Sequence, residues 1–261
     1  MRYLIVILLT IINCSAQYGL RNPALVGTLK TSYLMDNPPA AGGGGAFVFV
    51  KTNATQLATD TTTITVALPT VTAGNLIVLF VSHEGASTTI SASDGTTAFT
   101  GRTIIDHAGG EPHSRILYLL SSVASGTVTY TVTFGASRPF KNLHAWEFSY
   151  TGTCVYDTEP TGGGATGTTS TNPETVVTGN LTTTGANSVC ICGYGTWGGS
   201  SISEQTINSL TPNHITRSGD GLDYSQSFEL ISASTFTGQG SIRVNGSALR
   251  WTLNMAAFKT Q

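Results

Sequence analysis

The sequence is poor in charge. Only 10% of its 261 residues are Asp, Glu, Lys or Arg, against roughly 25% in an average soluble domain. The formal net charge is −2, and the basic residues are scattered singly, so no basic stripe offers a surface for phosphate groups. Nucleic-acid binding depends on clustered Lys and Arg. The sequence therefore predicts no nucleic-acid partner.

Helical periodicity and the common catalytic motifs are also missing. No segment shows a sustained 3.6-residue hydrophobic period. No G-x-S-x-G elbow is present, and no G-x-G-x-x-G follows a strand and opens a helix. These absences exclude the triad of the α/β-hydrolases and a dinucleotide-binding fold.

The longest apolar run is at the N-terminus, where YLIVILLTII follows Arg2 and precedes NCSAQ. This order of charge, apolar run and small residues is that of a secretory signal, with cleavage after Ala16. The run is shorter than the roughly 20 residues of a membrane span. A lipid-anchored Cys14 and a buried N-terminal strand are the alternatives. We expect a signal peptide at residues 1–16, no membrane span, and a secreted, extracellular or cell-surface protein.

Thr, Ser and Gly take the place of the missing charges, and β-branched Thr favours strands. GTVTYTVTF (126–134) alternates strictly, and GNLIVLFVSH (74–83) is a near-continuous apolar run, as in a strand covered on both faces or a strand of a tight sandwich. Prolines and glycines dominate the end of residues 17–45, which predicts a flexible leader or linker. The sequence predicts an all-β domain at residues 46–261.

Two parts of the chain resemble each other. TAGNLIVLFVSHEG (72–85) corresponds to TTGANSVCICGYG (183–195), and the strand and turn patterns that follow come in the same order. This predicts an internal repeat with half-units at about 46–160 and 171–259, separated by a glycine-rich linker or crossing loop. Two such halves, each with one apolar face, build a single antiparallel, jelly-roll-like β-sandwich. Two independent sandwiches are the alternative.

The strand succession resembles a known type of module. TAGNLIVLFVSHEG, SASDGTTAF, ILYLLSSVASGTVTYTVTF and HAWEFSYTGT, followed by Asp157, resemble a recurrent β-sandwich module of secreted bacterial surface proteins and phage or phage-like structural proteins. The resemblance covers about residues 46–259. It implies a jelly-roll-type sandwich that serves extracellular binding, adhesion or assembly. Its motifs are soft strand and turn patterns, so it transfers no active-site residues.

Two loops contain groups that suit a metal ion. DHAGGEPH (106–113) carries two histidines and two carboxylates on a glycine loop, which a polar rim loop also explains. Its candidate metal ligands are Asp106, His107, Glu111 and His113. SGDGLD (218–223) is a candidate structural calcium loop through Asp220 and Asp223, with a simple turn as the alternative. No other cofactor is predicted.

Aromatic residues in a glycine loop are the best indication of a binding site. GYGTWGGS (193–200) places Tyr194 and Trp197 among glycines just past a strand, where a rigid aromatic face suits stacking on a sugar ring. The alternative is that Trp197 folds back to cap the core. Trp146 and Trp251, at matching places in the two halves, are predicted core residues.

Three cysteines follow the predicted signal peptide. In an exported protein this odd count implies one disulfide and one free thiol. Cys190 and Cys192 are two residues apart on a strand and therefore share a face. Cys154 is thus the predicted disulfide partner of either one, and three buried thiols are the alternative.

Together these observations predict an extracellular, non-catalytic structural or interaction protein, for self-assembly, adhesion or glycan binding at a cell or particle surface. Uncharged edge strands are templates for pairing, and AFVFVK (46–51) is a candidate donor strand for a neighbouring copy. The alternative is a secreted jelly-roll carbohydrate-active enzyme, which requires two carboxylates across a cleft. Glu84, Glu111, Glu147 and Asp157 are the candidates, although spacing fixes no pair.

Overall fold

The computed structural model describes residues 47–198, 201–219 and 224–261, all of which belong to one compact unit. The predicted signal peptide and leader, Cys14, and the calcium candidates Asp220 and Asp223 lie outside the described residues. In the described part of the chain, no helix is both long and apolar enough to cross a membrane.

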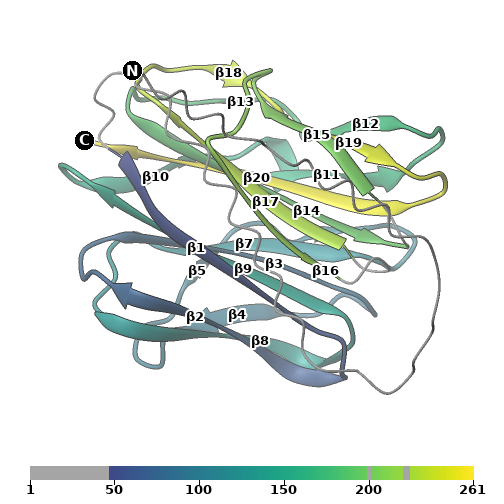
Figure 1. The fold of residues 1–261 in the computed structure, drawn as a ribbon, viewed down its shortest axis with the longest axis horizontal. Coiled ribbons are helices and arrows are strands. Elements are labelled where there is room, and N and C mark those ends of the chain that lie inside the picture. The colour runs from purple at the N-terminus through teal and green to yellow at the C-terminus, as the bar shows by residue number, and fades with distance from the viewer. Residues whose placement is uncertain (1–46, 199–200, 220–223) are drawn as a thin grey trace, which may run out of the picture. The chain divides into compact units, whose positions relative to one another are not determined.

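The described residues form antiparallel strands joined by turns, with one short 3₁₀ helix, η1 (Thr161–Gly163). The predicted all-β sandwich is therefore confirmed. The strands fall into four layers, which we name in order from the first outer sheet to the second outer sheet (Figure 1).

The first two layers belong to the first half of the chain. The first outer sheet has the order β2 (Thr61–Val71), β8 (Gly126–Arg138), β4 (Ile90–Ser93). The first inner sheet has the order β1 (Phe47–Leu57), β9 (Lys141–Tyr150), β3 (Leu76–His83), β7 (His113–Leu119), β5 (Thr100–Gly101), with β6 (Ile105–Asp106) also paired to β7.

The other two layers belong to the second half. The second inner sheet has the order β10 (Cys154–Thr158), β20 (Arg250–Thr260), β14 (Ser188–Trp197), β17 (Tyr224–Ser232), β16 (His214–Gly219), with β11 (Gly164–Thr168) also paired to β20. The second outer sheet has the order β12 (Glu174–Val177), β19 (Gly240–Asn245), β15 (Ser201–Ile207), and beside it lies the pair β13 (Leu181–Thr182) and β18 (Thr237–Gly238).

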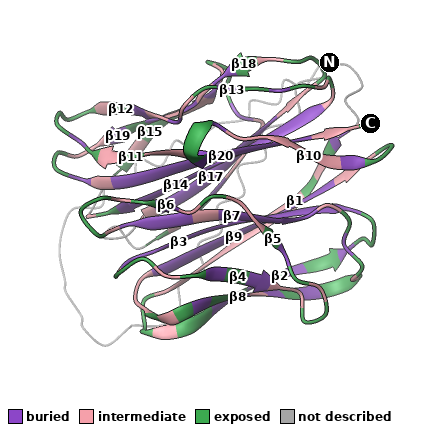
Figure 2. Cartoon of the chain, turned by 180° about the vertical axis from the view of Figure 1, so that it is seen from behind, coloured by how far each residue is buried: buried purple, intermediate pink, exposed green. Residues whose placement is uncertain are grey.

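Three apolar layers fill the spaces between the sheets. One lies under each outer sheet, and a third, which we call the central layer, lies between the two inner sheets. Figure 2 shows the consequence: the central strands of the inner sheets, such as β3, β9, β14 and β20, are buried over most of their length, whereas β2 and β8 of the first outer sheet alternate between buried and exposed residues. The central layer contains Phe47, Leu76, Val78, Phe80, Ile116, Tyr118, Trp146, Phe148, Cys154, Val189, Ile191, Ala256 and Phe258.

This layering explains the near-continuous apolar run of β3. Alternate residues of a strand point to opposite faces of its sheet. Ile77, Leu79 and Val81 enter the layer under the first outer sheet, and Leu76 and Val78 enter the central layer. The sandwich prediction gave each half one sheet and one apolar face. Instead, each half has two sheets with a core of its own, and the halves stack through their inner sheets.

The glycine-rich stretch at 161–173 is not only a linker. It contains η1 and β11, and β11 pairs with β20, as β10 does. The second half therefore begins at Cys154, earlier than the predicted 171. Glycine favours this packing, because a Cβ on Gly167 would lie only 3.0 Å from the Trp251 ring, which is a tight contact.

The strands of the two halves pair in the same order. β1-β9-β3-β7 corresponds to β11-β20-β14-β17, and β2-β8-β4 corresponds to β12-β19-β15. The internal repeat stays a prediction, and this shared order supports it. One detail was wrong: Trp146 lies in the central layer and Trp251 under the second outer sheet, so the two tryptophans do not occupy matching places, although both are buried.

A ring-to-backbone contact fixes the distance between the inner sheets. A Cβ placed on Gly193 of β14 would lie only 2.1 Å from the ring of Phe80 on β3. The ring therefore packs directly on the glycine backbone, and both residues are completely buried. A side chain at position 193 would force the Phe80 ring or the backbone to shift.

A buried chain of hydrogen bonds also crosses between the halves. Trp146 Nε1 donates to Ser227 Oγ at 2.8 Å, and Ser227 Oγ lies 2.6 Å from His144 Nδ1. On the other side of the ring, His144 Nε2 lies 2.7 Å from Ser218 Oγ, which donates to Asn142 Oδ1 at 2.8 Å. A neutral imidazole protonated at Nε2 satisfies every group. The chain ties β9 to β16 and β17.

The edge strand β1 is held in the same way. Thr216 Oγ1 of β16 donates to Thr52 Oγ1 of β1 at 2.7 Å. The His214 ring stacks on Phe49 with 3.7 Å between centroids, and its Nδ1 lies 2.6 Å from a carboxylate oxygen of the buried Glu229. The described part of the candidate donor strand, residues 47–51, thus pairs with β9 of its own chain.

The Gly193–Phe80 contact leads to a stability prediction. Gly193→Ala overpacks the central layer, and we expect it to lower the free energy of unfolding by about 1–3 kcal/mol. In a Phe80→Leu background, Gly193→Ala should lower the free energy of unfolding by less, because the leucine side chain leaves room for the new methyl group. Chemical denaturation of the four proteins measures this coupling. Gly179→Ala, whose Cβ would come no closer than 3.3 Å to another residue, is the control. Equal costs in both backgrounds would contradict the contact.

Two buried histidines predict loss of stability in acid. Burial lowers the pKa of His144 to about 3 and that of His83 to about 4, while both titrate near 6.5 in the unfolded chain. Between about pH 6.5 and 4 the unfolded state binds protons that the folded state does not, so the free energy of unfolding decreases as the pH is lowered. Each histidine contributes a slope of about 1.4 kcal/mol per pH unit. Urea denaturation at a series of pH values measures how the free energy of unfolding depends on pH. In His144→Gln this dependence should be weaker by about 1.4 kcal/mol per pH unit. An unchanged dependence would contradict a lowered pKa for His144.

Candidate functional site

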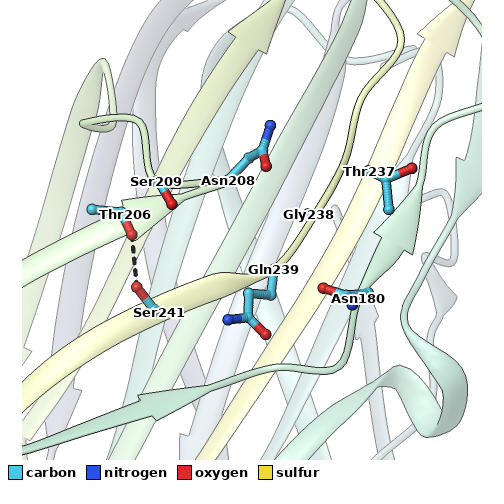
Figure 3. A pocket seen from close by; sticks show the side chains of 8 residues that line it. All are labelled: Asn180, Thr206, Asn208, Ser209, Thr237, Gly238, Gln239 and Ser241. Carbon is cyan, nitrogen blue, oxygen red and sulfur yellow. Dashed lines mark hydrogen bonds between the residues drawn. The ribbon is translucent and has the colours of Figure 1, made fainter.

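A polar hollow lies where the β13–β18 pair meets the second outer sheet. Its volume is about 330 Å³. The lining comes from the start of β13, the end of β15 and its following turn, and the β18–β19 segment (Figure 3). The lining residues are Asn180, Thr206, Asn208, Ser209, Thr237, Gly238, Gln239 and Ser241.

The turn after β15 positions one wall of the hollow. Asn208 and Ser209 both have left-handed backbone, with φ of 53° and 61°, a conformation that Asn tolerates better than most residues. The backbone groups of Ile207 and Leu210 close the turn with hydrogen bonds in both directions. Asn208 N donates to the carbonyl oxygen of Gln239 at 2.9 Å, which fixes the turn against the β18–β19 segment.

Glycine lets the two walls approach. A Cβ on Gly238 would lie 2.4 Å from Oδ1 of Asn208, so a larger residue would displace the amide. Two hydroxyl pairs stiffen the lining: Thr206 Oγ1 and Ser241 Oγ are 2.6 Å apart, and Thr237 Oγ1 lies 2.8 Å from a neighbouring hydroxyl. The hollow is therefore shaped by fixed strands and one strained turn.

The chemistry of the hollow is neutral and hydrogen-bonding. All its side chains are amides or hydroxyls apart from glycine, and none of them titrates. Within the described part of the chain, the side-chain amides of Asn180, Asn208 and Gln239 have no hydrogen-bond partner, so their donors and acceptors are open to a ligand. An apolar ligand would leave these groups unpaired, which costs free energy.

The loop predicted to bind metal is only partly assembled. His113 Nδ1 lies 2.6 Å from Asp106 Oδ1, and its Nε2 lies 2.5 Å from the Gly110 carbonyl oxygen. An imidazolium, which donates from both nitrogens, satisfies both contacts. His107 instead contacts Thr168, 61 residues away, and Glu111 accepts a bond from the Gly85 backbone N–H.

No group of three metal-binding side chains occurs among the described residues. His113 is also packed against His83, with 5.1 Å between the ring centroids. Burial lowers the pKa of His83 to about 4. The two rings stack on each other beneath the loop. The rim-loop interpretation of 106–113 fits these contacts better than a metal site does.

Glu147, a candidate catalytic acid, is a buried anchor. One of its carboxylate oxygens accepts hydrogen bonds from Thr72 N at 2.9 Å and Asn75 Nδ2 at 2.7 Å, and the other pairs with Lys51 Nζ at 3.3 Å. Glu147 thus holds the β2–β3 turn against β9. Asp157, another candidate, accepts from Thr184 and pairs with a lysine.

The two aromatic candidates, Tyr194 and Trp197, differ in exposure. Tyr194 is completely buried under the second outer sheet, so its predicted role as a ligand contact is wrong. On the same strand, alternation turns Trp197 outward at the strand end, where it is 39% exposed. The ring of Trp197 is covered on one side by the Arg250 guanidinium, 5.1 Å from its centroid. Neither aromatic residue lines the hollow.

The predicted disulfide is not formed. Cys154, Cys190 and Cys192 are free and buried. Cys190 and Cys192 share a face, as expected, and lie under the second outer sheet, whereas Cys154 lies in the central layer. The second inner sheet therefore separates Cys154 from both possible partners.

The sequence did not single out the residues of the hollow. Asn208-Ser209 marks a turn between strands, but such dipeptides are common in a chain this rich in Ser, Thr and Asn. Only strand pairing brings Asn180, Asn208 and Gln239 together, because they lie up to 59 residues apart in the sequence.

No protein-family model matches the chain, and no match was found among curated proteins or solved structures. The function must therefore be inferred from the chemistry of the sites themselves.

The cysteine geometry gives a direct chemical prediction. Burial raises the pKa of the Cys154 thiol to about 12 and that of Cys190 well above its usual range. We expect a Cys14→Ser chain to react with no equivalent of a thiol reagent when folded and with three equivalents in denaturant. The assay is run without reductant. A single reactive thiol in denaturant would instead reveal a disulfide.

Proposed function

We propose that the chain is an extracellular, non-catalytic binding protein whose polar hollow takes a neutral saccharide. The observation that carries the proposal is the lining: amides and hydroxyls line the hollow, and it contains no His, Asp, Glu, Lys or Cys to act as a general acid or base or to activate a hydroxyl. Such a lining offers binding without chemistry.

The hollow suits a sugar in both size and polarity. Its volume is at the lower end of the roughly 300–1,000 Å³ typical of ligand pockets. Saccharide hydroxyls both donate and accept hydrogen bonds, as the amides of Asn180, Asn208 and Gln239 do. The N-terminal signal pattern and the low charge of the chain support an extracellular setting.

The carbohydrate-active enzyme receives less support. Three of the four candidate carboxylates are engaged elsewhere: Glu147 in the β2–β3 anchor, Asp157 with Lys259, and Glu111 with a backbone amide. The hollow itself contributes no carboxylate to a catalytic pair.

A glycan array of neutral and acidic saccharides tests the proposal. We expect a neutral glycan to bind, and Asn208→Ala or Gln239→Ala to weaken its binding about three- to tenfold, because each removes one or two hydrogen bonds of roughly 0.5–1.5 kcal/mol. Calorimetry on the best array ligand measures the change.

The matched control is Asn245→Ala, an amide at the end of β19 outside the hollow. It should leave affinity unchanged. Glycan cleavage during incubation, or equal binding by the Asn208 and Asn245 variants, would sink the proposal.

A further inference from the structure

Two segments that are far apart in the sequence meet at the end of the molecule where the halves join. The loop between β6 and β7 in the first half lies against the end of β11 and the start of β20 in the second half (Figure 2). His107 Nε2 lies 3.2 Å from Thr168 Oγ1, and Arg250 Nη1 donates to the Gly109 carbonyl oxygen at 3.1 Å. We call the group of His107, Gly109, Thr168, Trp197 and Arg250 the seam site.

The aromatic ring and the guanidinium of the seam site are held together by strand pairing. Trp197, the last residue of β14, is the register partner of Arg250, the first residue of β20. The guanidinium lies 5.1 Å from the centroid of the Trp197 ring, which is 39% exposed. The site therefore presents a partly exposed aromatic ring with a cation over one of its faces.

No described carboxylate neutralises the positive charge of Arg250. In the described part of the chain it pairs with no carboxylate, whereas Arg102 pairs with Glu159 and Arg243 with Glu204. One of its five N–H donors reaches Gly109, and the planar fork suits a carboxylate with the donors that remain.

His107 adds no second charge. The backbone N–H of Gly109 donates to His107 Nδ1 at 2.9 Å, so that nitrogen is an acceptor and Nε2 carries the proton toward Thr168. Burial, followed by the neighbouring charge of Arg250, lowers the pKa of His107. The ring thus serves as a neutral, polar wall of the seam site.

We propose that the seam site binds a saccharide that carries a carboxylate, such as a uronic acid residue. The sugar ring stacks on the indole of Trp197, which offers a rigid apolar face. Its carboxylate pairs with the guanidinium of Arg250. A flexible acidic peptide would use the cation but gain little from the ring, so the combination favours the sugar.

Calorimetry on the full chain distinguishes the ligand classes. The probes are an oligosaccharide of uronic acid residues, the same oligosaccharide with its carboxyl groups reduced to alcohols, and a glutamate-rich peptide. We expect the uronic acid probe to bind at least tenfold more tightly than the other two. Its affinity should fall at higher salt, because the contact involves a surface charge.

Variants then assign the binding to this site. Trp197→Ala and Arg250→Gln should each weaken uronate binding at least tenfold, and Arg250→Lys should have a smaller effect because it keeps the charge without the fork. Arg250→Lys also covers the case in which loss of the Gly109 contact unfolds the glutamine variant.

Two control variants distinguish binding at the seam site from binding elsewhere on the surface. Arg243→Gln removes an exposed arginine that is paired with Glu204, and Asn208→Ala alters the polar hollow. Neither should change uronate affinity by more than twofold. Tight binding of the carboxyl-reduced probe, preference for the peptide, no uronate binding, or equal affinity in all variants would each overturn the proposal.

Discussion

The contact of the two inner sheets is the constraint on which the rest of the structure depends. Each inner sheet is covered on both faces, so its strands must carry apolar side chains in both directions. The Phe80 ring resting on Gly193 sets the spacing, and the hydrogen-bond chain through His144 sets the register. The seam site exists only because this stacking brings the first-half loop beside β20.

Strand positions were readable from local pattern. Strict alternation in GTVTYTVTF predicted β8, and the apolar run at 74–83 indicated a strand covered on both faces, which β3 is. The sequence does not identify the sheets that cover the two faces of β3, because an apolar face can pack against any other apolar face. The two similar stretches, 72–85 and 183–195, are offset by one residue when they are aligned on Asn75 and Asn187. Leu76 and Val189 both face the central layer, so Asn75 corresponds to Ser188 instead.

The sites were less predictable than the fold, for a related reason. Trp197 was singled out because an aromatic residue among glycines is rare, but its partner Arg250 lies 53 residues later and reads as an ordinary surface residue. Tyr194 sits in the same glycine loop, and a shift of three residues along a strand turns a side chain to the other face. The amides of the hollow carry no distinguishing pattern. Composition predicts which kinds of side chain are present, and strand pairing decides which of them lie together in a site.

The position of β20 has a consequence for how the chain is made. This last strand lies inside the second inner sheet, between β14 and the β10 and β11 segments. Four of the five buried residues that the second half contributes to the central layer come from β14 and β20. The first half is complete at Tyr150, 110 residues before Thr260. At synthesis rates of about 5–20 residues per second, its inner face stays uncovered for roughly 5–20 s. If the first half folds before synthesis is complete, Phe80, Trp146 and Phe148 on its inner face lack their covering sheet during that interval.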